Sequence, residues 1–143
     1  MKYELVESSI KDIEILIEYK KKTIYEYEKN LTAEEIEKIN SYINSKVREL
    51  INDYFIIMVY NKIVGCLLLT NKDDGILIDE IYLEEEYRSQ NIGTSIIKDI
   101  LNNNDIVYLR VHKDNKRAIS LYKKLGFIII DETDSRYYMK YCK

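Results

Sequence analysis

The chain has 143 residues, of which 46% are hydrophobic and 33% charged, and its formal net charge at pH 7 is −3. This length suits a single domain with one hydrophobic core, and the composition excludes a disordered chain. No apolar run approaches the roughly 20 residues that span a bilayer, and no apolar segment follows Lys2 as a secretory signal requires, so we expect a soluble, cytoplasmic protein without a membrane partner.

The first predicted elements are a strand and a long helix. Hydropathy alternates over residues 2–7, as it does in a half-buried strand. Ser8 or Ser9 then provides an N-cap for a helix over about residues 10–28, where apolar residues recur at spacings of three and four. Asn30 ends this helix, so the chain begins with a β-α unit.

A second helix and a hairpin follow. Thr32 and Glu35 form a capping-box pattern at the start of a helix over about residues 33–52. Two β-rich runs come next, and Asn61-Lys62 between them suits a tight turn. The strands predicted for this hairpin are residues 54–60 and 63–70.

The second half of the chain alternates strands and helices. The predicted elements are a polar turn at residues 71–75, a strand at 76–83, a helix that ends in the asparagines 102–104, a strand at 106–112, a helix that Asp114 or Asn115 caps and Gly126 ends, and strands at 127–131 and 136–141. The strands 76–83 and 106–112 should be parallel, because a crossover helix joins them. The order β-α-α-β-β-β-α-β-α-β-β predicts a mixed α/β fold.

The stretch 81–95 joins a strand to a helix through a short polar turn. The turn ends at Gly93, followed by Thr94 and Ser95, so several backbone N–H groups can point at one small volume beside a helix N-terminus, where the macrodipole favours an anion such as phosphate. Arg88 adds a fixed positive charge whose planar fork suits phosphate oxygens. The alternative is a solvated loop that caps an ordinary strand–helix unit.

Composition also bears on metals and partners. Cys66 and Cys142 form neither a disulfide framework nor a metal-ligand spacing, and the chain has one histidine, so we expect a reducing compartment and no metal site. The acidic balance argues against a nucleic-acid partner, which requires a basic surface, and is compatible with a small cationic partner.

A second motif, over residues 109–127, accompanies the polar turn. Together the two motifs resemble the GNAT acyl-CoA-dependent N-acetyltransferases, whose signatures are R/Q-x-x-G-x-G/A and L-x-V-x-x-x-N-x-x-A-x-x-x-Y-x-x-x-G-F. Asn91 stands where the first signature usually has glycine; it suits a positive φ, but its side chain would crowd a pyrophosphate in contact with the backbone. We expect a positive φ with the side chain turned away. The residues that match the second signature in register are Val111, Asn115, Ala118, Tyr122, Gly126 and Phe127.

The resemblance implies one N-acetyltransferase domain over residues 1–143, with acetyl-CoA as co-substrate. It implies a GNAT-like fold in which two central parallel strands splay, so that the pantetheine arm pairs with strand backbone. The polar turn would hold the pyrophosphate, and Asn115 would hydrogen-bond the pantetheine or neighbouring backbone. The implied cofactor-binding residues are Ile81, Tyr82, Leu83, Arg88, Ser89, Gln90, Asn91, Ile92, Gly93, Thr94, Asn115 and Tyr122.

The resemblance also implies direct attack of a neutral amine on the acetyl carbonyl. Tyr122 would protonate the leaving CoA thiolate, because a neutral phenol can donate a proton. In some members a glutamate before Val111 accepts the amine proton, but here that position is Arg110. Asp79 and Glu80 are the nearby acids; adjacent strand residues face opposite ways, so at most one is expected to point into the site, and Glu80 is favoured. A water chain is the alternative base.

The acceptor is then a primary amine on a small molecule or peptide, and the sequence does not identify it. In the family the first helices and the last hairpin shape the acceptor pocket, which makes Tyr25, Tyr27, Tyr137 and Tyr138 candidate lining residues; a homodimer is an expectation by analogy. The alternative functions are a non-catalytic acyl-CoA-binding module and an ordinary α/β domain that binds another nucleotide. Tyr122 as a core aromatic and Asn115 as a simple N-cap are the structural alternatives.

Overall fold

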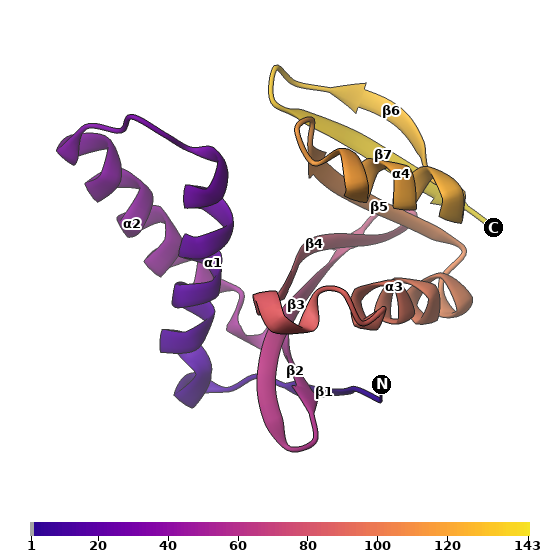
Figure 1. The fold of residues 1–143 in the computed structure, drawn as a ribbon, viewed down its shortest axis with the longest axis horizontal. Helices are drawn as coiled ribbons and strands as arrows, with labels where there is room; N and C mark the ends of the chain where they lie inside the picture. The colour runs from indigo at the N-terminus through magenta and orange to yellow at the C-terminus, as the bar shows by residue number, and fades with distance from the viewer. Residues whose placement is uncertain (1) are drawn as a thin grey trace. The chain divides into compact units, whose positions relative to one another are not determined.

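The computed structural model describes residues 2–143, and its elements follow the predicted order (Figure 1). Residues 2–67 and 82–87 form one compact unit, and residues 68–81 and 88–143 form the other. The strands have the order β1-β2-β3-β4-β5-β7-β6. Within residues 2–143, no helix is both long enough and apolar enough to cross a membrane. The elements are β1 (Glu4–Glu7), α1 (Ile13–Tyr27), α2 (Ala33–Glu49), β2 (Tyr54–Val59), β3 (Lys62–Lys72), β4 (Gly75–Leu83), α3 (Ile92–Asn103), β5 (Ile106–His112), α4 (Lys116–Leu125), β6 (Ile128–Glu132) and β7 (Arg136–Cys142).

In the first unit α2 begins at its predicted cap, Thr32, whereas α1 begins at Ile13 with Asp12 as its N-cap in place of the predicted Ser8 or Ser9; Ser9 is the N-cap of the short turn that precedes α1. Asp12 accepts the N–H of Ser9 at 2.9 Å, and a short 3₁₀ turn over Ile10–Asp12 precedes α1. The capping box of α2 is confirmed: Thr32 Oγ1 accepts the N–H of Glu35 at 3.1 Å, and the Glu35 carboxylate accepts the N–H of Thr32 at 3.0 Å. The predicted helix 33–52 is too long, because α2 ends at Glu49 and a 3₁₀ turn follows it.

Two predicted turns were misplaced. The β2–β3 turn consists of Tyr60 and Asn61, with φ of 49° and 63°, one residue before the predicted Asn61-Lys62. Two positive φ values are the type I′ geometry that matches the twist of a hairpin. The predicted loop 71–75 is shorter, because β3 runs on to Lys72 and β4 begins at Gly75. A Cβ at Gly75 would lie 2.3 Å from the carbonyl oxygen of Ile106, so glycine allows β4 to approach β5.

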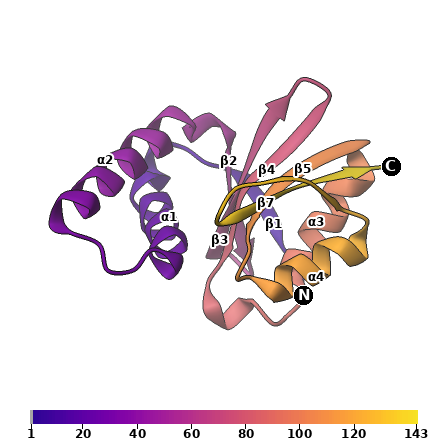
Figure 2. The same ribbon diagram turned by 90° about the horizontal axis from the view of Figure 1, so that it is seen from above.

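In the second unit, β4 and β5 are parallel as predicted, and residues 76–78 pair with residues 107–109. β7 pairs antiparallel with both β5 and β6, and so lies between them. Right-handed crossovers that advance in one direction across a sheet put their helices on one face. Figures 1 and 2 show α3 and α4 on the same side of β5 and β7. The side chains of Val107, Leu109, Val111 and Met139, at alternating positions of these strands, are buried.

The ends of α3 and α4 use the residue types that the sequence indicated. The carboxamides of Asn103 and Asn104 donate to the carbonyls of Asp99 and Ile100 in the last turns of α3. Gly126 ends α4 with a φ of 109°, the left-handed C-cap conformation. These local terminations set the points at which the chain leaves α3 for β5 and α4 for β6.

Candidate active site

The backbone before α3 has the conformation that the sequence predicted. Asn91 has φ 62° and ψ 13°, so the expectation of a positive φ is confirmed. The predicted boundary was too late: the turn ends at Asn91, and Gly93 and Thr94 lie in the first turn of α3. Asn91 O accepts the N–H of Ser95 at 3.0 Å, and the N–H groups of residues 92–94 have no acceptor within the helix.

An anion can therefore be bound at this helix start. The three N–H groups lie at the positive end of the α3 dipole, and Ile92, only 1% exposed, anchors that end in the core. Arg88, Ser89 and Gln90 form the exposed turn immediately before Asn91. The side chain of Asn91 makes no capping hydrogen bond to the helix. Asparagine thus adopts the left-handed backbone for which the family usually has glycine, and backbone N–H groups remain available to a ligand.

The parallel strands β4 and β5 part after a short ladder. Their ladder ends at the pair Ile78↔Leu109, whereas β5 continues to His112 and β4 continues past Asp79 and Glu80. Ile81 is the last β4 residue in this unit. Strand backbone beyond the end of a ladder can pair with an extended ligand.

The last two residues of β4, Tyr82 and Leu83, belong to the other unit. A Cβ at Gly65 would lie 2.0 Å from the carbonyl oxygen of Tyr82, so only glycine allows β3 to pass there. Tyr19 of α1 stacks on Tyr82 with ring centroids 4.7 Å apart, and its hydroxyl donates to Glu84 Oε2 at 2.9 Å. Burial, together with this hydrogen bond, raises the pKa of Tyr19 well above its ordinary value.

The two candidate acids of β4 have different environments. Glu80 is 8% exposed, whereas Asp79 is exposed, in keeping with the alternation of a strand. Asp79 Oδ1 lies 3.9 Å from Nη1 of Arg110, and the guanidinium of Arg110 lies 5.2 Å from the ring centre of Tyr138. Glu80 is therefore the buried acid of this strand, and Asp79 is held beside an arginine.

The residues of the second motif surround α4. Asn115 is its N-cap: the side-chain oxygen accepts the N–H of Ala118 at 3.2 Å, which leaves the amide NH₂ as the donor that can reach a ligand. Tyr122 is half-buried, and its ring meets Phe127 edge-on with centroids 5.8 Å apart. The carbonyl of Tyr122 also accepts the N–H of Phe127 at 3.0 Å. The N-cap alternative for Asn115 is thus realised, and Tyr122 packs on an aromatic neighbour.

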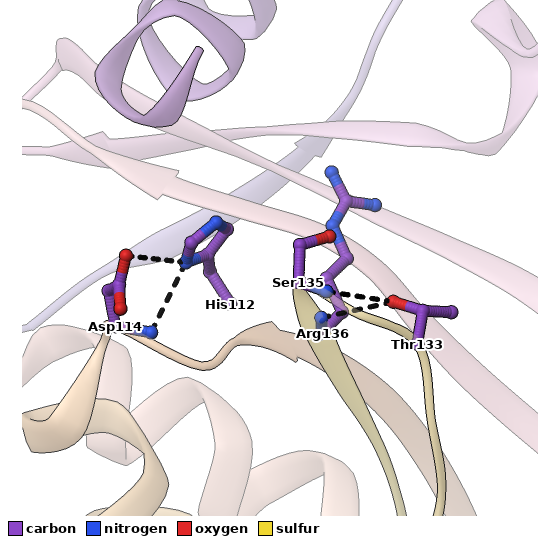
Figure 3. Close-up of polar contacts among 5 residues, drawn as sticks. All are labelled: His112, Asp114, Thr133, Ser135 and Arg136. Atoms are coloured by element: carbon purple, nitrogen blue, oxygen red, sulfur yellow. Dashed lines mark hydrogen bonds and ion pairs between the residues drawn. The ribbon is translucent and has the colours of Figure 1, made fainter. Parts of the chain in front are cut away.

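A polar pocket of about 440 Å³ on the β6–β7 hairpin was missed by the sequence reasoning apart from its two tyrosines. Thr133 Oγ1 accepts the N–H groups of Ser135 and Arg136, at 3.4 and 3.1 Å, and shapes the hairpin (Figure 3). Figure 3 shows the side chains of His112 and Arg136 extending to the same side of their strands; His112 Nδ1 accepts the N–H of Asp114 at 3.2 Å. The lining comprises Arg110, Asp131, Glu132, Thr133, Ser135, Arg136, Tyr137 and Tyr138.

Comparisons with known proteins identify the family and the fold of the chain. Residues 14–127 match the model of the acetyltransferase (GNAT) family, and no curated protein matches the chain. Similar solved structures include PaiA N-acetyltransferase from Thermoplasma acidophilum in complex with coenzyme A (TM-score 0.77, 23% identity, 100% of both chains). Another is Ard1 from Thermoplasma volcanium (TM-score 0.71, 22% identity, covering 99% of this chain and 98% of that one). A third is Arabidopsis thaliana Naa50 in complex with the bisubstrate analogue CoA-Ac-MVNAL (TM-score 0.70, 18% identity, covering 100% of both chains). At these identities the likeness shows the fold.

Proposed function

The chain belongs to the acetyltransferase (GNAT) family, and from this membership we propose that it moves the acetyl group of acetyl-CoA to a primary amine of a small molecule or peptide. The observation that carries the proposal is the start of α3, where the left-handed backbone of Asn91 precedes N–H groups without helical acceptors and follows Arg88. We take both compact units to be parts of one N-acetyltransferase domain over residues 1–143.

The residues of this chain fit acetyl-CoA. The N–H groups of residues 92–94 and the Arg88 guanidinium would bind the pyrophosphate, which is the chemistry that a helix N-terminus favours. The backbone of β4 from Ile81 to Leu83 would pair with the pantetheine arm, and the NH₂ of Asn115 would donate to it. When bound, acetyl-CoA supplies an acetyl group activated as a thioester.

The catalytic groups follow from the need to move two protons. The amine must lose a proton before it attacks, and Glu80, a largely buried carboxylate on β4, accepts it. As the new C–N bond forms and the C–S bond breaks, Tyr122 donates its phenolic proton to the sulfur and regains one from solvent. Asp79 is the second candidate base, and a water chain is the third.

Binding and catalysis are tested separately. Acetyl-CoA at a hundredfold excess over its Kd should stabilise the protein by about 2.7 kcal/mol and raise its melting temperature by several degrees, whereas ATP at the same concentration should not. Arg88→Gln should weaken this effect. The absence of a shift with acetyl-CoA would contradict the proposal.

Catalysis is measured as thiol release from acetyl-CoA with a panel of amines. Tyr122→Phe should lower kcat on the order of 100-fold, and Tyr42→Phe, at an exposed position of α2, is the matched control. Glu80→Gln should lower kcat/KM, whereas Asp79→Asn should not. Equal effects of the two acid variants would remove Glu80 from its assigned role.

One observation favours a second function. Arg110, which cannot accept a proton, occupies the position where some family members have the acid. This substitution is what a non-catalytic acyl-CoA-binding module would tolerate. A melting shift with acetyl-CoA but no thiol release with any amine would support that alternative.

A further inference from the structure

The hairpin pocket begins where the parallel strands part. Arg110 is the first β5 residue after the ladder with β4 ends at Leu109, and it is opposite Tyr138 of β7. The next pair on the same side of these strands is His112↔Arg136. This side is the one opposite the buried residues that α3 and α4 cover. The pocket therefore begins at the gap between β4 and β5, on the strand pair beside which the proposed function places the pantetheine arm.

The first arginine of the pocket, Arg110, packs over an aromatic ring that is itself stacked on a second one. The Arg110 guanidinium lies over Tyr138, and Tyr138 stacks on Tyr108 with centroids 5.4 Å apart and planes 13° from parallel. Asp79 approaches Arg110 only to 3.9 Å, which is beyond hydrogen-bond distance. Because a guanidinium carries five N–H donors in a rigid fork, this stacked side chain can still bind a carboxylate or phosphate through two parallel bonds.

The remaining charges of the pocket are unevenly paired. Among residues 2–143, no interaction engages the guanidinium of Arg136, whereas Glu132 is neutralised by an ion pair with Lys113. Asp131 has no cationic partner in the same range, and its side chain accepts only the N–H of Glu132 at 2.8 Å. The pocket thus offers an unpaired cation and a second, loosely paired one, together with an unpaired carboxylate.

This charge pattern excludes some ligand classes. A simple polyamine would meet two guanidinium groups, and a ligand with several phosphates would meet Asp131, so neither is complementary to the whole pocket. A volume of about 440 Å³ lies within the range of small-molecule sites, about 300–1,000 Å³. A small molecule that carries one anionic group and an amine is complementary to it.

We propose that the pocket on the β6–β7 hairpin takes an amino-acid-like acceptor, whose carboxylate or phosphate binds Arg110 and Arg136 while its primary amine faces the gap between β4 and β5. The inference rests on the proposed function and names the class of its acceptor.

The test compares acceptors that differ only in the acid group. Free amino acids and their carboxamides present the same amine, and the rate is thiol release from acetyl-CoA. The acids should have a kcat/KM about 10- to 100-fold higher, the usual effect of a charge-assisted hydrogen bond. An aminoalkyl phosphate compared with the corresponding amino alcohol tests a phosphate as the acid group in the same way.

Variants assign the preference to the pocket. Arg136→Gln should raise KM for the acids and reduce the ratio of kcat/KM for the acids to kcat/KM for the carboxamides, and Arg136→Lys should keep part of the preference. Arg48→Gln, on α2 and outside the pocket, is the matched control and should keep all of it.

The outcomes separate this inference from the function beneath it. Equal rates for acids and carboxamides, or acetylation of peptides but of no free amino acid, would overturn the acceptor class while acetyl transfer stands. A preference for acids that survives Arg136→Gln and Arg110→Gln would overturn the pocket assignment. The absence of both a melting shift and thiol release with acetyl-CoA would overturn the proposed function, and the inference with it.

Discussion

The left-handed residue before α3 can be tested against a second asparagine in the same conformation. Asn91 has a φ of 62° and Asn61, in the β2–β3 turn, has a φ of 63°. The left-handed backbone conformation costs an L-residue roughly 1–2 kcal/mol, and this cost is smaller for asparagine than for alanine. Both Asn91→Ala and Asn61→Ala should therefore lower the free energy of unfolding by about 1 kcal/mol, or the melting temperature by about 3–4 °C in a chain of this size.

Only the Asn91 variant should also change ligand binding. If the backbone before α3 presents N–H groups to a pyrophosphate, Asn91→Ala should weaken acetyl-CoA binding, and Asn91→Gly should bind at least as tightly as the natural chain. Asn61→Ala, equally destabilised, should bind normally. Urea unfolding gives the stability, and calorimetric titration with CoA gives the Kd.

Two results would contradict this role of Asn91. If Asn91→Ala binds acetyl-CoA as tightly as the natural chain, the left-handed conformation is not needed for the cradle. If Asn91→Gly binds more weakly than the natural chain, the asparagine side chain contributes to binding, contrary to our expectation that it turns away from the phosphates.

Further predictions concern three other residues, Gly65, Tyr19 and Glu35. Gly65→Ala should destabilise the fold by about 1–3 kcal/mol in urea unfolding, because its Cβ would lie 2.0 Å from the carbonyl oxygen of Tyr82; an unchanged stability would mean that β3 shifts freely. Tyr19→Phe should cost about 1–3 kcal/mol, because it leaves Glu84 without the phenol, and a fully stable variant would count against that hydrogen bond. Because the pKa of Tyr19 is raised in the folded protein, its contribution to the free energy of unfolding is fully present below the ordinary tyrosine pKa and is lost as the pH rises above that value. Tyr19→Phe should abolish this alkaline loss of stability in unfolding curves. The backbone N–H of Thr32, the N-cap of α2, holds the pKa of Glu35 below its ordinary value. The contribution of Glu35 to the free energy of unfolding is therefore present above the ordinary value and is lost as the pH falls through the depressed pKa, and Glu35→Gln should remove this loss of stability in acid.

Local chemistry explains why much of the fold was predictable. Caps such as Thr32 and Asn115 satisfy backbone groups within three residues of themselves, so their effect does not depend on the rest of the molecule. Asn91 was predictable for the same reason, because its backbone conformation follows from the residue types that tolerate it. The β2–β3 turn was misplaced by one residue because strand twist, which composition does not report, selected Tyr60 and Asn61.

The site required long-range pairing. The sequence indicated which two acids lie on β4, but burial against other elements distinguished Glu80 from Asp79. The pocket depends on β7 lying between β5 and β6, because that order sets Arg110 opposite Tyr138 and His112 opposite Arg136. Sequence periodicity determined the elements, their order and the loop before α3, because these follow from interactions between near neighbours in the chain. Only the tertiary structure decided which strands became neighbours, and therefore which charged side chains share one pocket. Strand pairing joins residues that are far apart in the sequence, and no local sequence pattern indicates which of them will pair.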